Sequence, residues 1–225
     1  MKKRIQIDSS ILTFVIVFTF LMYKFPHIYP AGESTDNVLD FVGMLFIMKG
    51  VLLRMAARGF KKANSARSQA LVTDGIYALT RNPMYLGSFY IGTGFVLIVW
   101  PWWTWLIFAA LFYLRFKKQV LAEEKFLTTM FGEEYKKYCQ KVSRVFPSLA
   151  SLRKAKYREI LNPQYLFSTK DARGLFWWPV LAVVLETIQE NVVYYESSVP
   201  QTVMIFLSAM ALFAAITYAE YQTRN

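Results

Sequence analysis

The stretch Leu71-Val-Thr-Asp-Gly-Ile-Tyr-Ala-Leu-Thr-Arg-Asn-Pro-Met-Tyr-Leu-Gly87 combines a turn signal with the start of an apolar helix. Within it, Asp74-Gly75 is a dipeptide typical of turns. Asn82 followed by Pro83 predicts a helix N-cap with proline at the first helical position. Because the chain is predominantly apolar from Leu86 to Trp100, we expect a membrane helix to begin here.

The first turn of this helix is a candidate anion site. Its backbone N–H groups have no partners within the helix and carry a partial positive charge, which suits a carboxylate or a phosphate. Arg81 adds a cation beside this turn, and Tyr77 and Tyr85 add aromatic faces with polar tips. A capped membrane helix with an arginine that snorkels to the interface would explain the same residues.

The composition indicates a polytopic membrane protein. Of the 225 residues, 55% are hydrophobic and 17% are aromatic, and the apolar residues occur in long blocks. The formal net charge is +11, which in a soluble protein would suggest nucleic-acid binding. Here the basic residues flank apolar blocks, so the positive-inside rule accounts for them and we expect no nucleic-acid partner.

Cysteine and histidine are scarce, which excludes several kinds of site. The chain has one cysteine, Cys139, and one histidine, His27, so zinc clusters and intramolecular disulfides are impossible. Histidine-dependent acid–base chemistry would have to use His27, in a short loop between two apolar blocks. We predict no metal site, and we interpret Cys139 as a small buried apolar residue and not as a nucleophile.

Six apolar blocks predict six membrane passes. They cover residues 9–23, 38–57, 84–99, 103–116, 174–195 and 199–218. Trp100-Pro-Trp-Trp103 separates the third block from the fourth, and this connection is short enough to require a tight helical hairpin. We therefore predict an all-α polytopic fold of about six transmembrane helices, with interfacial helices on the cytosolic side. Gly132 is expected to interrupt the charged helix that follows the hairpin.

A second polar group follows the hairpin on the same side as Arg81. Glu123 and Glu124 are either solvated residues of a charged helix or ligands for a cationic or polyhydroxyl group. S-adenosylmethionine would suit both the helix start beside Arg81 and the Glu123-Glu124 pair, because it carries a carboxylate, an ammonium, ribose hydroxyls and a sulfonium. Its carboxylate could lie at the helix start, its ammonium or ribose at Glu123, and its adenine or sulfonium against Tyr77 or Tyr85.

Four segments around the hairpin together resemble the isoprenylcysteine carboxyl methyltransferase family. They are the 71–87 stretch, Glu123-Glu124, Phe131-Gly-Glu-Glu-Tyr135 and Val142-Ser-Arg-Val-Phe-Pro147. That family belongs with the phospholipid methyltransferases in a wider group of integral-membrane methyltransferases. The resemblance covers about a third of the chain, and its specificity lies in the order and spacing of the pieces. It implies a cytosol-facing S-adenosylmethionine site that is not a Rossmann fold.

The resemblance also implies roles for individual residues. Arg81 and Glu124 match positions that family members need for a working site, so they are the catalytic candidates. The implied cofactor contacts are Gln69, Ala70, Leu71, Val72, Tyr77, Asn82, Pro83, Met84, Tyr85 and Glu123.

Two positions depart from the family pattern. The usual Arg-His-Pro is Arg81-Asn82-Pro83 here, as in bacterial members of the wider group, so cofactor binding is expected to survive but a histidine-dependent step is not. Enzymes that act on prenylcysteine place an arginine four residues before the first glutamate, where it meets the substrate carboxylate. This chain has Gln119 at that position, which we assign to substrate binding. The methyl acceptor could therefore also be a phospholipid amine, a small thiol or another lipophilic molecule.

Two further pairs lie four residues apart and so share a helix face. Ser88 and Gly92 predict a close-packing face. Glu186 and Glu190 lie near the end of the fifth apolar block, where carboxylates suggest a functional site. We favour the simpler interpretation, in which this helix ends near Leu185 and both glutamates are solvated.

The sequence thus predicts an integral-membrane methyltransferase that uses S-adenosylmethionine. We expect residues 1–70 to hold two membrane helices and a basic linker, 71–147 the methyltransferase core, and 148–225 a basic segment and two more membrane helices. The cofactor would enter from the cytosol, and a lipophilic acceptor would enter from the bilayer among membrane lipids. A bacterial inner membrane is favoured over the endoplasmic reticulum.

Two other functional classes stay open. A nicotinamide-dependent membrane reductase would also bind a nucleotide at the cytosolic face, although the sequence has no phosphate-cradling glycine loop. A non-enzymatic membrane scaffold is the second, and it does not account for the clustering of Arg81, Asn82, Tyr85, Glu123 and Glu124 on one side.

Overall fold

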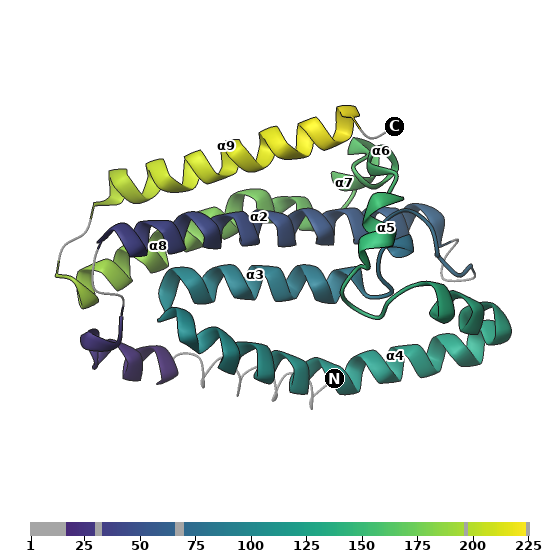
Figure 1. Ribbon diagram of the computed structural model, residues 1–225, viewed down its shortest axis with the longest axis horizontal. Helices are drawn as coiled ribbons and strands as arrows, with labels where there is room; N and C mark the ends of the chain where they lie inside the picture. Colours follow the sequence, from purple (N-terminus) through teal and green to yellow (C-terminus); the bar gives the residue numbers. More distant parts are fainter. Residues whose placement is uncertain (1–16, 30–32, 66–69, 196–197, 224–225) are drawn as a thin grey trace.

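Three of the other long helices pack on helix α2 (Glu33–Asn64), which lies in the middle of the bundle (Figure 1). The computed structural model describes residues 17–29, 33–65, 70–195 and 198–223, and these ranges contain α-helices and 3₁₀ turns but no strand. Helices α3 (Pro83–Val99), α8 (Gly174–Val193) and α9 (Val199–Thr223) all contact α2. The predicted all-α fold is confirmed for the part of the chain that the structure describes.

Helices α3 and α4 (Trp105–Lys141) form the predicted hairpin. Pro101 and the 3₁₀ turn η4 (Trp102–Thr104) connect them, and the Thr104 hydroxyl donates a 2.8 Å hydrogen bond to the carbonyl of Pro101. A proline has no backbone N–H and cannot continue a helix, so the chain reverses here. Helix α4 runs on past the hairpin to Gly132, whose φ of +50° interrupts it as predicted.

Glycines allow α2 and α3 to pack closely. Gly43 and Gly50 of α2 face Gly94 and Gly87 of α3, and a Cβ atom on Gly50 would lie 2.5 Å from the Gly87 carbonyl oxygen. No real Cβ approaches a backbone oxygen that closely, so these positions require glycine. Close approach of this kind is typical of membrane helices, which pack through small residues.

The predicted close packing is found at Gly92, which packs against α4, but Ser88 and Gly92 are not the residues that bring α3 close to α2. A Cβ atom on Gly92 would meet the Phe108 ring of α4, whereas the Ser88 hydroxyl accepts a 2.5 Å hydrogen bond from Arg54 of α2. The glycines of α3 that do face α2 are seven residues apart, which is close to two full helical turns. Residues two turns apart lie on the same face of a helix, so this spacing places both Gly87 and Gly94 against α2.

The chain that connects α4 to α8 forms short helices, and these cover one end of the bundle. They are α5 (Leu149–Arg153), α6 (Tyr157–Ile160), α7 (Pro163–Leu166) and the 3₁₀ turn η5 (Lys170–Arg173). Asp171 ties this segment to α2 through ion pairs with Arg58 at 3.1 Å and Arg54 at 3.6 Å. The Asp171 side chain is only 13% exposed, so both pairs are partly shielded from water.

The interpretation that α8 ends near Leu185 with its glutamates in water is wrong. Helix α8 continues to Val193, and Glu186 is completely buried. Its carboxylate lies beside those of Asp36 and Asp40 in the first two turns of α2. The neighbouring helix removes this glutamate from solvent, and local hydropathy carries no information about such a neighbour.

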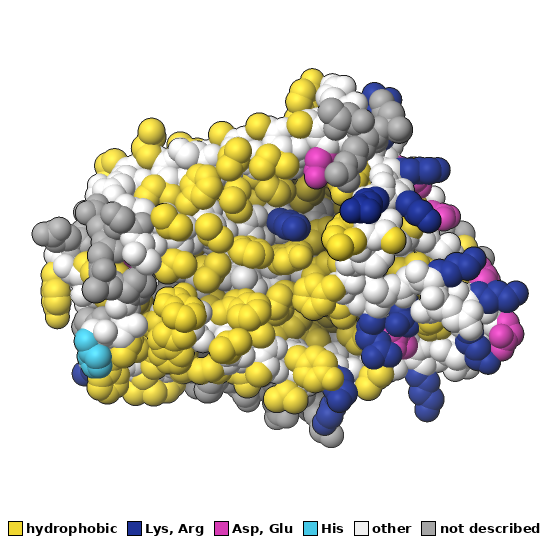
Figure 2. Space-filling view, in the orientation of Figure 1, with side chains coloured by type: hydrophobic (Ala, Val, Ile, Leu, Met, Phe, Trp, Pro, Cys, Tyr) yellow, Lys and Arg dark blue, Asp and Glu magenta, His cyan; other side chains and the backbone are white. Residues whose placement is uncertain are grey.

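The surface divides into an apolar body and a basic end. Among the described residues, α9 is the one helix whose length and composition suffice to cross a bilayer, with a mean hydropathy of 2.0 over Val199–Gln222. Helix α3 is apolar but has only 17 residues. Figure 2 shows hydrophobic side chains over the long helices, and Lys and Arg side chains gathered at the end where α5, α6, α7 and the last part of α4 lie. This is the charge distribution that the positive-inside rule describes.

Candidate active site

The turn before α3 fixes Tyr77 at the basic end of the bundle. Gly75 has a φ of +56°, a conformation that favours glycine, and it begins the 3₁₀ turn η3 (Gly75–Ala78). The Tyr77 hydroxyl donates a 3.3 Å hydrogen bond to the carbonyl of Ala57 in α2. Burial, and then the nearby Glu123 carboxylate, raise the pKa of Tyr77 to about 12. Tyr77 is therefore a neutral hydrogen-bond donor at physiological pH.

The chain that leaves α4 lies alongside the chain that enters α3. The backbone N–H of Arg81 donates a 2.9 Å hydrogen bond to the carbonyl of Ser143. Pro83 begins α3 as predicted, but the Asn82 side chain does not cap the helix. Its amide instead donates a 2.9 Å hydrogen bond to the carbonyl of Arg144. The side-chain part of the predicted N-cap is therefore wrong, because the hydrogen bond from the Asn82 amide nitrogen to a carbonyl about 60 residues away sets the orientation of this side chain.

Glu124 is held by two arginines. Its Oε1 lies 3.2 Å from Arg81 Nη1 and accepts a 2.9 Å hydrogen bond from Arg144 Nε, while its Oε2 accepts another at 2.9 Å from Arg144 Nη2. Arg81 Nη1 also donates to Cys139 Sγ at 2.8 Å. The side chains of Arg81 and Glu124 are 12% and 13% exposed, so this ion pair is largely shielded from water. Hydrogen bonding to the Glu124 carboxylate raises the pKa of Arg144.

Arg144 was not among the predicted site residues. It lies within Val142-Ser-Arg-Val-Phe-Pro147, one of the segments that carried the family resemblance, so a signal was present. Its partner could not be read from the sequence, because 20 residues and the Gly132 break separate it from Glu124. The bidentate geometry orients the Glu124 carboxylate and occupies both of its oxygens.

Glu123 faces the first turn of α3. The Tyr85 hydroxyl donates a 2.6 Å hydrogen bond to Glu123 Oε1, and Gln119 Nε2, one turn earlier on α4, lies 3.3 Å from the same oxygen. The Tyr85 ring packs on Phe116 with the ring centroids 5.3 Å apart. Glu123 is exposed, and its hydrogen bonds within the described part of the chain all reach Oε1. The second carboxylate oxygen of Glu123 is therefore available to a ligand.

The other predicted cofactor contacts differ in how far they are exposed to a ligand. Pro83 is buried and the Met84 side chain packs on the hydrophobic core, so their backbone is what a ligand could meet. Residues 70–72 pass from exposed to half-buried, and Val72 packs on the core. Gln69 lies outside the described residues, so its predicted role stays a prediction.

An aromatic cluster extends from Tyr85 between the two arms of the hairpin. Phe89 is at its centre, with its ring centroid 5.3 Å from Phe112, 5.7 Å from Phe108 and 6.1 Å from Phe146. We call this group the aromatic cluster; its members are Tyr85, Phe89, Phe108, Phe112, Phe116 and Phe146. It connects the polar group around Glu123 with the apolar flank of the hairpin.

Comparison with known proteins finds sequence similarity to methyltransferases. Residues 38–134 match the phospholipid methyltransferase family. The chain is 26% identical over 138 residues to the protein-S-isoprenylcysteine O-methyltransferase of Schizosaccharomyces pombe, which covers 60% of this chain and 54% of that protein. It is 26% identical over 165 residues to the Homo sapiens protein of the same name, covering 67% of this chain and 58% of that protein. Identity to protein-S-isoprenylcysteine O-methyltransferase A of Arabidopsis thaliana is 30% over 128 residues, or 53% of this chain and 64% of that protein.

The matched region includes the hairpin with Arg81, Glu123 and Glu124, whereas Arg144 lies beyond it. The chain spans only about half to two thirds of the length of these curated relatives. No solved structure matches the chain.

Proposed function

We propose that this chain, whose residues 38–134 belong to the phospholipid methyltransferase family, transfers methyl groups from S-adenosylmethionine to a lipophilic acceptor. The observation that carries the proposal is the hydrogen bond between Tyr85 and Glu123 at the mouth of the hairpin, inside the matched region. It places a carboxylate beside a helix N-terminus. A zwitterionic cofactor needs these two complementary charges close together.

We assign the cofactor to the polar group formed by the first turn of α3 and Glu123. The residues fit such a ligand, because Glu123 keeps one carboxylate oxygen open to an ammonium or a ribose hydroxyl. Tyr77 and Tyr85 offer aromatic faces suited to adenine or a sulfonium. Bound S-adenosylmethionine supplies an activated methyl group.

Arg81 and Glu124 act in this proposal by holding the site together. Their ion pair, extended by Arg144, joins the hairpin to the 142–147 segment that lies beside the entry to α3. Guanidinium groups contact both oxygens of Glu124. This favours the positioning role over the alternative role, in which Glu124 accepts a proton from an amine substrate. The residues of the chain then contribute mainly by orienting the reactants and excluding water.

The acceptor is lipophilic, and the aromatic cluster is its route from the bilayer to Glu123. Rings of the cluster continue from Tyr85 along both arms of the hairpin, so an apolar chain can lie against them. The relatives are named for isoprenylcysteine. Gln119 offers no charge to a substrate carboxylate, so a phospholipid amine or a small thiol is the alternative acceptor.

We further propose six membrane passes, made by the segment that contains residues 17–23, by α2, α3, the first part of α4, α8 and α9. The clustering of Lys and Arg at the end that carries Arg81 and Glu124 supports a cytosolic active site (Figure 2). The Asn82 form resembles bacterial members of the wider group, which favours a bacterial inner membrane.

Calorimetric titration of the detergent-purified full chain with S-adenosylmethionine tests the cofactor. We expect saturable binding that both Tyr85→Ala and Glu123→Ala weaken at least tenfold, because each removes a charged or hydrogen-bonding contact. Glu133→Ala is the matched control, since that glutamate is 75% exposed on the same helix. A well-folded wild type that does not bind the cofactor would overturn the proposal.

The acceptor and the rival classes are separated by two further measurements. Radiolabelled methyl transfer to fractionated lipids, prenylcysteine analogues and thiols identifies the acceptor class. Thermal stabilisation by NADPH, but not by S-adenosylmethionine, would favour the membrane reductase. A melting temperature that neither cofactor moves would favour the scaffold.

A further inference from the structure

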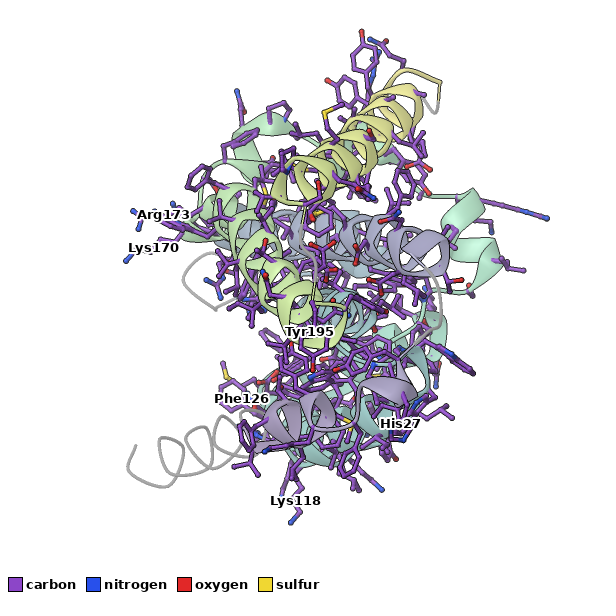
Figure 3. All side chains as sticks on the ribbon, turned by 90° about the vertical axis from the view of Figure 1, so that its left-hand side faces the viewer. His27, Lys118, Phe126, Lys170, Arg173 and Tyr195 are labelled. Atoms are coloured by element: carbon purple, nitrogen blue, oxygen red, sulfur yellow. The ribbon has the colours of Figure 1, made fainter. Side chains whose placement is uncertain are left out.

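Three buried carboxylates meet at the end of the bundle opposite Arg81. Asp36 and Asp40 lie one turn apart on α2, and Glu186 comes from α8; they are 7%, 2% and 0% exposed. One carboxylate oxygen of each lies within 4.8 Å of the others. Figure 3 views the molecule from this end, with Tyr195 facing the viewer where α8 has just ended.

These carboxylates have no cationic partner within the described part of the chain. None of the ion pairs there involves Asp36, Asp40 or Glu186. Asp40 Oδ1 and both oxygens of Glu186 are buried without a donor from another side chain or from the backbone, and the Asp40 and Glu186 carboxyls lie close enough to share a proton. Burying a carboxylate is costly unless it is paired, protonated or bound to a metal, so the cluster requires an occupant or protons.

Gln189 gives an independent indication of a ligand. It is 1% exposed, its side chain hydrogen-bonds Asp36, and its Oε1 has no hydrogen-bond partner. The amide nitrogen is the group that can donate to the Asp36 carboxylate, so the unpartnered amide oxygen lies in the buried region beside Asp36. One proton shared between two carboxyls would satisfy two of these acceptors, whereas a single cation can coordinate one oxygen from every side chain at once.

We propose that Asp36, Asp40, Glu186 and Gln189 form a binding site for a hard divalent cation, with Ca²⁺ the best fit. Ca²⁺ takes oxygen ligands at about 2.3–2.6 Å, so ligand atoms around one ion lie at most about 4.6–5.2 Å apart. The spacing of up to 4.8 Å among the carboxylate oxygens of Asp36, Asp40 and Glu186 meets this limit. All four side chains offer oxygen and none offers sulfur or nitrogen lone pairs, which favours Ca²⁺, Mg²⁺ or Mn²⁺ over zinc.

The ion would join the start of α2 to the end of α8. Glu186 lies about two turns before α8 ends at Val193, and Asp36 lies three residues after α2 begins, so the site is close to the bundle end that faces away from the basic surface. In the proposed topology this end of the bundle faces the outer aqueous phase, which would supply the ion. Our prediction of no metal site considered cysteine and histidine ligands, and this site uses neither. The proposal is independent of the methyltransferase activity.

Equilibrium dialysis of the chelator-treated, detergent-purified full chain against ⁴⁵Ca²⁺ tests the site. We expect one saturably bound Ca²⁺ per chain in the wild type and a melting temperature that rises on the order of 5 °C at 100-fold the dissociation constant. Glu186→Gln should lose both effects. Glu133→Gln, which changes an exposed glutamate, should behave as wild type.

Gln189→Met keeps the charge and the approximate volume of the side chain but removes the amide oxygen. It should weaken Ca²⁺ binding about tenfold, and it serves if Glu186→Gln does not fold. The absence of saturable binding of Ca²⁺, Mg²⁺ and Mn²⁺ by the wild type would overturn the proposal. So would equal binding by the wild type and Gln189→Met. Shared protons would instead make Glu186→Gln more thermostable than the wild type with or without Ca²⁺.

Discussion

The Tyr85 hydroxyl and the Glu123 carboxylate are joined by a 2.6 Å hydrogen bond across the hairpin, although 38 residues separate them in the chain. The bond is short, as expected for a neutral donor and a charged acceptor. It orients one carboxylate oxygen of Glu123, and the other accepts no hydrogen bond within the described part of the chain. The hydrogen bond therefore fixes the orientation of the Glu123 carboxylate before a ligand binds.

Tyr85→Phe should weaken S-adenosylmethionine binding while keeping the aromatic ring. Loss of a hydrogen bond to a charged group typically costs about 1.5–3 kcal/mol, so we expect the dissociation constant to rise at least tenfold. Calorimetry measures the change. Tyr113→Phe on α4 is the control, because that ring is 59% exposed. Equal affinity in the wild type and Tyr85→Phe would mean that the pair does not serve the cofactor.

Arg144→Gln should destabilise the fold even though this arginine is about half exposed. It removes a bidentate ion pair with Glu124, and after allowance for solvent screening we expect the unfolding free energy to fall by about 1 kcal/mol. A thermal or denaturant titration in detergent measures this. Arg153→Gln, an exposed change in α5, should have little effect. If both variants lose the same stability, the ion pair is not the cause.

Glu124→Gln separates a positioning role from proton acceptance. If Glu124 holds Arg81 and Arg144 in place, the variant should lose about 2 kcal/mol of stability and lose cofactor affinity together with turnover, because the arginines are left without their anion. Measurements of melting temperature, cofactor affinity and methyl transfer on one preparation decide the question. Turnover abolished with stability and affinity intact would instead assign Glu124 as the proton acceptor for an amine substrate.

Phe89→Ala should impair use of the acceptor and spare the cofactor. The ring is the centre of the aromatic cluster, so its loss opens the apolar surface between the hairpin arms. We expect the KM for the lipophilic acceptor to rise about tenfold, with the S-adenosylmethionine dissociation constant within twofold of wild type. Phe126→Ala removes a ring that is 60% exposed on α4 and is the control. A parallel loss of cofactor affinity would contradict the proposed route.

Gly94→Ala should separate α2 from α3. The new Cβ atom would contact the carbonyl oxygen of Gly43 and the side chain of Ile47, and backbone cannot move aside as a flexible side chain can. Overpacking of this kind costs about 1–3 kcal/mol. Thermal unfolding measures the loss, with Ala215→Val on the exposed face of α9 as the control. A melting temperature equal to that of wild type would show that the helices have room to relax.

Local chemistry determined which parts of this protein are helical. Apolar blocks predicted the first residue of α3, α8 and α9 to within one residue, the missing N–H of Pro101 indicated the hairpin turn, and Gly132 indicated the break that follows the hairpin. The order of Arg81, Glu123 and Glu124 around that hairpin carried the resemblance to the methyltransferase family, and residues 38–134 match the phospholipid methyltransferase family. The helix starts, the turn and the break each depend on residues close together in the chain.

Only the tertiary structure decided where the polar side chains find their partners. The Asn82 amide bonds to the carbonyl of Arg144 and not to its own helix, and Glu186 is buried beside Asp40 instead of being solvated. The physical reason is that a polar atom is satisfied by whichever donor or acceptor packs beside it. In both cases that neighbour belongs to another helix or loop more than 60 residues away, and helical periodicity carries no information about it.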